Sequence, residues 1–495
     1  MRPDAGPACV ATPAAVHRDA APPICQPPEG DLSDRRRWAI LVFLLAVSFL
    51  AQLNFFIVNP CLPAMSADFE GASLSAVSWV LNAYSILFAA MLVPVGRIAD
   101  IRGRKGVLLI GIVIFTVASA VCALAPDLGV LIGARAVQAI GAAMIIPTSL
   151  GLLYPSFPER QHTLVVGIWA GVSSVATPCG PFLGGVIASV SWRWVFVLNL
   201  PIGVLALIAG ALLLPKVCQP EGSRLPEALS LGSLLSAVAF LVLATVQGPI
   251  WGWSNGHTIG LYAAAAVATA LTVQRSLRAA EPVIEKCLFE SIYFTAATLA
   301  AFIYYGGSAV FIVGCTLFMQ HVWHFSAMGA GLAMAPAAAI AVIFAVSAGP
   351  IASRLGRAWP GVLGTMSMTA GAIYWILMID PTPHYATAML PGLVLMGISA
   401  GLTPPPIFAA ANTLAADRAT TGSAVINMCR QVGTAVGVAV LVALTAKCPA
   451  SIGYPRAWTM QAITGVVSAI ILLAGATLAR HRSLPTPLST AGDSR

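Results

Sequence analysis

The chain has 495 residues, of which 58% are hydrophobic and only 9% are charged, and its mean hydropathy is +0.87. Soluble domains carry about 25% charged residues, so this composition excludes an ordinary soluble protein and indicates an integral membrane protein. The net charge of +8 does not indicate nucleic-acid binding, because the basic residues are spread over short segments between apolar stretches and no nucleic-acid motif is present. We therefore expect the protein to contact the lipid bilayer and not to bind nucleic acid.

Residues 1–37 are rich in proline, alanine and charge, and they end in three consecutive arginines, Arg35 to Arg37. A full-length apolar stretch follows at once. This order predicts a disordered cytoplasmic N-terminal tail followed by a membrane anchor, rather than a cleaved signal peptide.

Fourteen stretches reach the roughly 20 mostly apolar residues that a membrane helix needs. They are 38–59, 77–96, 106–125, 129–150, 164–188, 195–215, 229–247, 258–275, 293–318, 328–349, 359–378, 388–411, 422–445 and 458–479. Because the runs are continuous rather than alternating, they exclude a β-barrel. The sequence predicts an all-α integral membrane fold with 14 transmembrane helices.

The distribution of basic residues predicts the orientation, since cytoplasmic loops are enriched in lysine and arginine. With the N-terminus in the cytoplasm, only Arg193, Lys447 and Arg456 of the 26 basic residues fall outside, and Arg135 and Arg430 fall within spans. All the others fall on the cytoplasmic side. We therefore expect a multi-pass protein of the inner or plasma membrane with both termini in the cytoplasm.

An internal repeat divides the chain. "GRIADIRGR" (Gly96–Arg104) and "GPIASRLGR" (Gly349–Arg357) share G-x-I-A-x-x-x-G-R, and each follows the second helix of a block of six. The predicted parts are an N-terminal six-helix bundle, a linker with inserted helices 7 and 8, a C-terminal six-helix bundle and a cytoplasmic tail, at residues 38–215, 216–292, 293–479 and 480–495. Two parallel halves around a central site are typical of a rocking transporter.

Five short sequence motifs resemble those of a known family of membrane proteins. They are "GRIADIRGRKG" between helices 2 and 3, "RAVQAIGAAMIIP" in helix 4, "CGPFLGG" in helix 5, "SWRWVFVLNLPIG" between helices 5 and 6, and "NMCRQVGTAVGVAV" in helix 13. With them, residues 38–480 resemble the major facilitator superfamily, specifically its fourteen-helix drug–proton antiporter branch. The resemblance implies the major facilitator fold and the export of drugs or antibiotics.

Two of these strings carry roles that the resemblance implies. The first is a conformational latch on the cytoplasmic face, in which Asp100 can pair with nearby arginines or with helix ends; its residues are Gly96, Arg97, Asp100, Gly103, Arg104 and Lys105. A second interpretation, which is compatible with the first, is that this loop is a basic segment that fixes the membrane topology. The second is the antiporter motif of Gly180, Pro181, Gly184 and Gly185, for which a bent packing helix is the alternative.

Helix 1 departs from the family pattern L-D-x-x-I-V-N-x-x-L-P. This chain reads "LNFFIVNPCLP", so Asn54 stands where the family has an aspartate that is implicated in proton coupling. Asparagine cannot take up and release a proton, and no Asp or Glu lies in the interior of a predicted span. The candidate transport and coupling residues are Asn54, Asn59, Arg135, Gln138 and Arg430.

Arg135 is a cation within a span and has no acidic partner nearby in the sequence. Three interpretations stay open: it bonds backbone carbonyls with Asn54 or Gln138 in a wet cavity, it faces an anionic group of the substrate, or it pairs with Asp100 or another terminal acid in one conformation. We expect Arg430 to line the central cavity or to bond carbonyls there.

The sequence thus predicts a secondary transporter that exports amphipathic small molecules by alternating access. The proton-motive force is the expected energy source, with no cofactor and no metal. Alternatives are a proton-uncoupled facilitator or exchanger of neutral or anionic metabolites, and a transport-inactive sensor. We expect a monomer. We also expect no enzymatic activity, because the sequence shows no metal cluster, nucleotide loop or nucleophile–base set. Candidate aromatic walls of the substrate cavity are Trp169, Tyr304, Tyr305, Tyr374 and Trp375.

Overall fold

A computed structural model describes residues 33–69, 72–188, 190–215, 225–279, 282–415, 418–445 and 450–483. The elements in these ranges are all helical, as predicted. A search of the described residues finds thirteen helices that are long and apolar enough to cross a membrane. The fifth predicted span, 164–188, lies in a further helix of 30 residues, α7 (Glu159–Ala188). Each of the fourteen predicted spans therefore coincides with a helix.

The N-terminal half consists of six long helices and their short connections. The long helices are α1 (Asp34–Ile57), α4 (Trp79–Arg102), α5 (Arg104–Ala123), α6 (Leu128–Ser156), α7 and α9 (Asn199–Leu213). The connections are η1 (Asn59–Cys61), α2 (Leu62–Asp68), α3 (Leu74–Val77) and α8 (Trp194–Val197). Helix α1 begins four residues before the predicted span, while residues 1–32 of the predicted tail lie outside the described residues.

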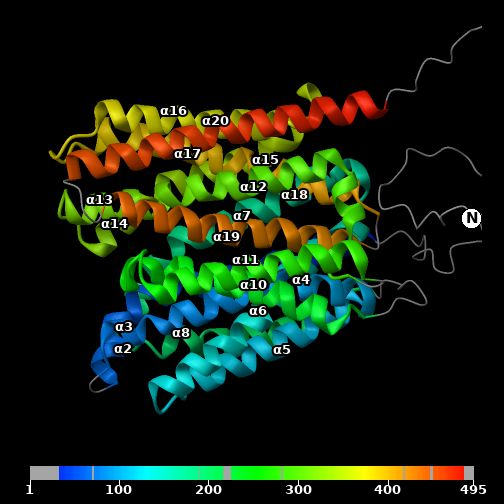
Figure 1. Ribbon diagram of the computed structural model, residues 1–495, viewed down its shortest axis with the longest axis horizontal. Coiled ribbons are helices and arrows are strands. Elements are labelled where there is room, and N and C mark those ends of the chain that lie inside the picture. The colour runs from blue at the N-terminus through cyan, green and yellow to red at the C-terminus, as the bar shows by residue number, and fades with distance from the viewer. Residues whose placement is uncertain are drawn as a thin grey trace, which may run out of the picture.

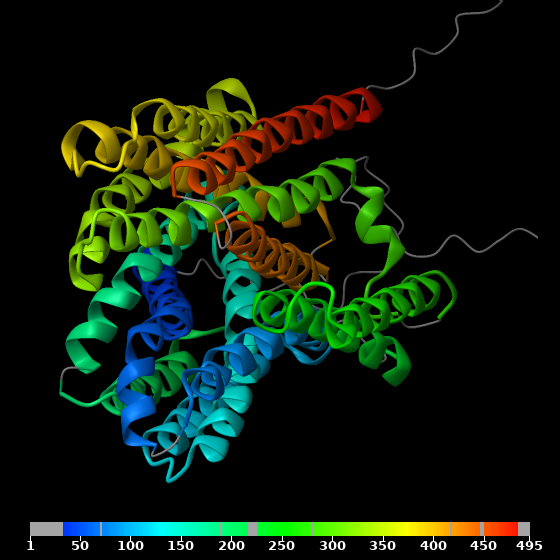
Figure 2. The same ribbon diagram turned by 60° about the vertical axis from the view of Figure 1, so that its left-hand side comes forward.

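The C-terminal half repeats this plan. Its first, second and third spans are α12 (Ile292–Ala309) with η3 (Val310–Gly314) and α13 (Cys315–His321), α14 (Ala327–Ala333) with α15 (Ala335–Leu355), and α16 (Trp359–Met378). The last three are η4 (Tyr385–Met389) with α17 (Leu390–Leu402), α18 (Pro404–Ala409) and η5 (Ala410–Thr413), then α19 (Ala419–Thr445) and α20 (Ala450–Ser483). Figure 2 shows the N-terminal half, coloured from blue to teal, below the C-terminal half, coloured from yellow-green to red.

The repeat found in the sequence has the same backbone conformation in both halves. Gly103 ends α4 with φ 102°, and Gly356, at the matching position, ends α15 with φ 109°. Side-chain-bearing residues rarely adopt such values. The shared glycine therefore turns the chain at the same point of each half.

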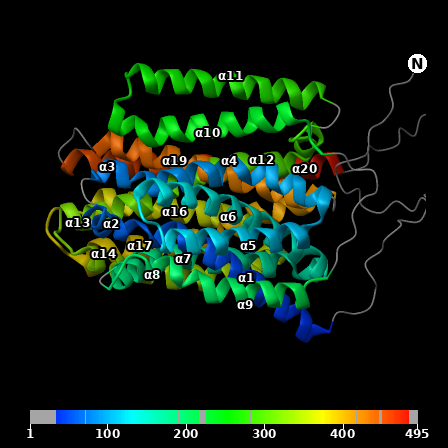
Figure 3. The same cartoon turned by 90° about the horizontal axis from the view of Figure 1, so that it is seen from below.

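Helices α10 (Ala228–Trp251) and α11 (Gly256–Arg278) form the inserted pair. Helix α10 packs against α4 of the N-terminal half and α19 of the C-terminal half, whereas α11 packs mainly on α10. Figure 3 shows the pair along one edge of the bundle. Both halves thus share this neighbour.

The two halves meet along α4 and α19 on one flank and along α7 and α15 on the other. On the second flank, a Cβ on Gly167 would lie 2.6 Å from the carbonyl oxygen of Ala345, so the helices touch through backbone. Helix α1 begins and α20 ends at the same end of the bundle (Figures 1 and 3). Because Asp100 also lies there, we call it the latch end.

Candidate functional site

A buried polar network in the N-terminal half surrounds Arg135 of α6, whose side chain is 0% exposed. Its Nη1 donates to Asn54 Oδ1 and to Gln138 Oε1, both at 2.6 Å, and its Nε donates to the Val80 carbonyl at 3.2 Å. The guanidinium carbon lies 4.1 Å from the centre of the Tyr84 ring, a cation–π distance. The structure therefore brings together three of the five predicted coupling residues.

The network continues from Gln138, which donates from Nε2 to Ser119 Oγ at 2.6 Å, and Asn199 donates to the same oxygen at 3.2 Å. All these partners are neutral. Arg135 Nη2 has no hydrogen-bond partner among the described residues. The geometry matches the interpretation in which carbonyls, Asn54 and Gln138 hold Arg135.

Asn54 thus accepts a hydrogen bond where a carboxylate would form an ion pair. Arginine at the centre of a membrane helix costs about 2.5–3.5 kcal/mol on insertion scales, and here neutral acceptors and an aromatic ring offset that cost. Asn59 is separate from this network: it is exposed at the start of η1, beyond the end of α1.

Arg430 of α19 lies between the halves. Its Nη1 and Nη2 both donate to Gln52 Oε1 of α1 at 3.3 Å, and its guanidinium carbon lies 5.7 Å from the Tyr305 ring centre. Arg430 Nε and Gln52 Nε2 are buried and have no partner in the described part of the chain. The structure therefore does not join Arg430 to the Arg135 network by a hydrogen bond.

The glycines of the predicted antiporter motif pack α7 against α1. A Cβ on Gly180 would lie 2.4 Å from Phe56 Cβ, and one on Gly184 would lie 2.1 Å from the Ile57 carbonyl oxygen, whereas one on Gly185 would meet nothing within 4 Å. Pro181 lies in α7, but its side chain is outside what the structure describes. The motif thus permits close helix contact through Gly180 and Gly184.

The C-terminal half contains an equivalent contact that we did not predict. Gly433 and Gly437 of α19 press on the backbone of Phe302 and Gly306 in α12, at 2.2 and 2.1 Å from a Cβ position to a carbonyl oxygen. The spacing G-x-x-x-G is the same as in α7. Comparing the fifth helices of the two blocks would have found it.

The latch joins the halves at Asp100, which is 7% exposed. Its Oδ1 accepts from Arg104 Nε and Nη2 at 3.0 and 2.9 Å, and its Oδ2 accepts from the backbone N–H and the hydroxyl of Thr421 at 2.7 and 2.8 Å. Thr421 lies in the first turn of α19, where the helix dipole favours a negative charge. Asp100 therefore binds a helix end of the opposite half.

Other predicted latch residues surround this contact. A Cβ on Gly96 would lie 2.6 Å from Ala424 Cβ, so α4 and α19 are in close contact there. Lys105 donates to the carbonyls of Ala211 and Leu214, at 2.9 and 2.6 Å, at the C-terminal end of α9. Gly96 thus contributes to the contact between halves, and Lys105 to contacts within one half.

Arg97 does not pair with Asp100. It forms an ion pair with Glu285, which precedes η2 (Lys286–Glu290), and Glu285 Oε2 also accepts from Arg418 Nε at 2.6 Å. Arg97 belongs to α4 and Arg418 directly precedes α19, so Glu285 bridges the halves from the segment after the inserted pair. No sequence signal pointed to Glu285 or Thr421, because each is far along the chain from its partners.

The predicted aromatic residues have different environments. Trp169 lies between the halves: its Nε1 donates to Ser48 Oγ at 3.1 Å and its ring lies 5.4 Å from that of Phe408. The Tyr304 and Tyr305 rings of α12 are 5.1 Å apart.

The other two aromatic candidates lie within the C-terminal half. Trp375 is 0% exposed and packs on Phe311 and Trp458, while the Tyr374 hydroxyl donates to the Thr387 carbonyl. Trp169 therefore contacts side chains of both halves, whereas the described contacts of Trp375 and Tyr374 lie within their own half.

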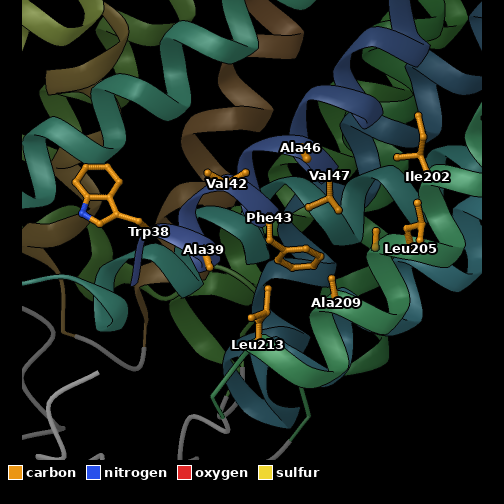
Figure 4. A pocket seen from close by; sticks show the side chains of 11 residues that line it. Trp38, Ala39, Val42, Phe43, Ala46, Val47, Ile202, Leu205, Ala209 and Leu213 are labelled. Carbon is orange, nitrogen blue, oxygen red and sulfur yellow. The ribbon is translucent and has the colours of Figure 1, made fainter. Parts of the chain in front are cut away.

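An apolar groove of about 530 Å³ lies between α1 and α9 (Figure 4). Its lining residues are Trp38, Ala39, Val42, Phe43, Ala46, Val47, Ile202, Leu205, Ala206, Ala209 and Leu213. Val42 and Leu205 are 64% and 67% exposed, so the groove lies on the outer surface of the bundle. It offers no charged group that would orient an amphipathic molecule. Within the described ranges, no group of three or more His, Cys, Asp or Glu could hold a metal ion.

The sequence matches the family model of the Major Facilitator Superfamily over residues 44–438. It is 30% identical to the tetracenomycin C resistance and export protein of Streptomyces glaucescens, over 86% of this chain and 78% of that protein. It is 33% identical to the methylenomycin A resistance protein of Bacillus subtilis (81% and 86%) and 32% identical to the multidrug resistance protein Stp of Mycobacterium tuberculosis (79% and 73%).

Among solved structures, the human organic anion transporter MFSD10 (TETRAN) superposes with a TM-score of 0.64, over 90% of this chain and 100% of that one. The sequence identity is 14%, so this likeness concerns the fold alone.

Proposed function

Because the chain belongs to the major facilitator superfamily, we propose that it exports amphipathic small molecules, of the antibiotic and multidrug class named for its relatives, by alternating access. The carrying observation is that Asp100 and Glu285 join the two halves at one end by ion pairs and hydrogen bonds. Such contacts can open without unfolding either half. The substrate would bind between the halves near the membrane midplane.

The proposal includes an orientation. The latch end carries Arg97, Arg104, Lys105 and Arg418, and cytoplasmic segments are enriched in such residues. We therefore place the latch end and both termini in the cytoplasm and the protein in the plasma membrane. In this orientation the structure is closed toward the cytoplasm. The protein would act as a monomer in the bilayer, as a transporter rather than an enzyme.

The family resemblance favours the proton-motive force as the energy source. A specific observation favours a second candidate, an exchanger that is not coupled to protons. Asn54, which accepts from Arg135 at 2.6 Å, carries no titratable proton, and the acidic residues of the described helices lie at helix ends. A titratable group near the midplane is the usual means of coupling proton flow to transport.

One experiment separates the two energy sources. Purified protein in liposomes would export a fluorescent drug with and without an imposed pH gradient, for the wild type and for Asn54→Asp. Coupled export predicts faster transport with the gradient in the wild type. Uncoupled exchange predicts that the wild type is indifferent and that Asn54→Asp gains at least about threefold pH sensitivity, because the new carboxylate faces Arg135 and can titrate.

Asn59→Asp is the matched control, since it places the same carboxylate at an exposed position outside the network. It should leave the pH response of the wild type unchanged. An equal response of both variants would refute the role of the position beside Arg135. Absence of any solute movement by the wild type, with a partner protein co-purifying, would refute export and favour a sensor of the same fold.

A further inference from the structure

The two arginines within the spans differ in how many of their guanidinium N–H groups find a hydrogen-bond acceptor. Arg135 is fully buried, donates to three acceptors and lies on an aromatic ring, and of its three guanidinium nitrogens Nη2 alone has no partner among the described residues. Arg430 is partly buried and, among the described residues, donates only to Gln52 Oε1, at 3.3 Å. Within the Arg430–Gln52 pair, the buried atoms that have no partner in the described part of the chain, Arg430 Nε and Gln52 Nε2, are both donors. A buried donor without an acceptor costs about 1–3 kcal/mol, so this point of the structure lacks an acceptor.

The missing acceptor would lie near the middle of the membrane and between the halves. Arg430 is the twelfth residue of α19, so a rise of 1.5 Å per residue places it roughly 16 Å from the latch end, about half of a 30 Å hydrocarbon core. Gln52 belongs to α1 of the opposite half. A ligand bound to both side chains would therefore contact both halves.

The charge of the surrounding residues indicates what kind of ligand group could supply the missing acceptor. The interiors of the described helices contain Arg135 and Arg430 but no acidic residue, so this region is positive. It would repel a cation and attract an anion. A carboxylate or sulfonate has several acceptor oxygens, and such groups form short, charge-assisted hydrogen bonds with guanidinium. One anionic group could accept from Arg430 and from Gln52 Nε2 together.

The surroundings indicate the rest of the ligand. The Tyr305 ring lies 5.7 Å from the Arg430 guanidinium carbon and 5.1 Å from the Tyr304 ring. These rings offer an apolar wall beside the donors. Building on the proposed export function, we infer that Arg430 and Gln52 bind the anionic group of the exported molecule and that the substrates are amphipathic aromatic acids.

Two matched probes test this inference in proteoliposomes. 1-Anilinonaphthalene-8-sulfonate carries a permanent negative charge, and N-phenyl-1-naphthylamine is its uncharged parent. The wild type should transport the sulfonate. Arg430→Gln should lower its transport at limiting concentration by at least about tenfold, as loss of a charge-assisted contact predicts, and should change transport of the neutral probe less than about twofold. Arg430→Lys should retain most sulfonate transport.

Two further variants keep the test decisive. Gln52→Glu should block the sulfonate and spare the neutral probe, because the new carboxylate occupies Arg430 while the shape is kept. Arg135→Gln should lower transport of both probes together, since its guanidinium supports the N-terminal half. Thermal unfolding of each variant checks that it is folded.

The outcomes separate the two proposals. Equal losses of both probes in Arg430→Gln and Gln52→Glu, or no loss in either variant, would overturn the anion site. A wild type that transports only the neutral probe would also overturn it and leave export standing. A wild type that transports neither probe would overturn export, and the anion site with it.

Discussion

Replacing Asp100 by asparagine should open the latch end. The substitution keeps the side-chain shape but removes the charge that faces Thr421 and the first turn of α19. The bonds to Arg104 lie within one half and survive opening, so among the described contacts of Asp100 only those to Thr421 distinguish the closed from the open arrangement. The matched position of the repeat is Ser353, whose hydroxyl donates to the Pro350 carbonyl of its own helix and to no other group in the described part of the chain, and it provides the control.

The size of the effect follows from these contacts. A hydrogen bond to a charged group contributes about 1.5–3 kcal/mol net, and a carboxylate at a partly buried helix N-terminus contributes up to about 2 kcal/mol. Asparagine still accepts one neutral hydrogen bond from Thr421. We expect the closed arrangement to lose about 2–3 kcal/mol relative to the open one. Since 1.4 kcal/mol is a factor of ten, the closed-to-open ratio should fall about 30- to 140-fold.

Single-molecule distance measurement in nanodiscs can read this ratio. Fluorophores at Asp34 and Arg354, exposed residues of opposite halves at the latch end, would be introduced through unnatural amino acids so that the ten native cysteines stay intact. Asp100→Asn should populate a long-distance state that Ser353→Ala does not. Thr421→Val removes one of the two bonds and should give an intermediate shift. Equal distance distributions for Asp100→Asn and Ser353→Ala would refute the reasoning.

Two further predictions concern packing and the bridge between halves. Gly184→Ala should destabilise the protein by about 1–3 kcal/mol, as overpacking does, because its Cβ would lie 2.1 Å from the Ile57 carbonyl oxygen. Gly185→Ala is the control and should be neutral, since its Cβ would meet nothing within 4 Å. Equal thermal unfolding midpoints of the two variants would contradict the packing role of Gly184. Glu285→Gln should shift the same distance distribution toward the open state, since it weakens an acid that bridges an arginine of each half, and an unchanged distribution would show that this bridge does not hold the halves together.

The helices and the two-half plan could be predicted from the sequence because each span carries its own signal. Hydropathy marks every span, and the repeated glycine of Gly103 and Gly356 marks the same turn in both halves. Asp100 could likewise be predicted as a latch residue from its motif, since its partner Arg104 is four residues away, just after the turn at Gly103.

Its other partner could not be predicted, because Thr421 lies 321 residues along the chain. The pairing of Arg430 with Gln52 spans 378 residues and follows only from how the halves dock. Hydropathy and motifs report local chemistry, whereas these contacts depend on the rotation of each helix about its axis. The Asn54–Arg135 contact was one of three open interpretations for the same reason.

The inserted pair makes the two flanks of the protein unequal. Helix α10 packs against α4 of the N-terminal half and α19 of the C-terminal half. When one half rotates against the other, α10 can move as a rigid body with only one half and must slide along the helix of the other half. On the opposite flank, where Gly167 meets Ala345, nothing comparable straddles the seam among the described helices. If the halves rock as proposed, we therefore expect them to separate less on the flank that includes α10 than on the flank where α7 meets α15.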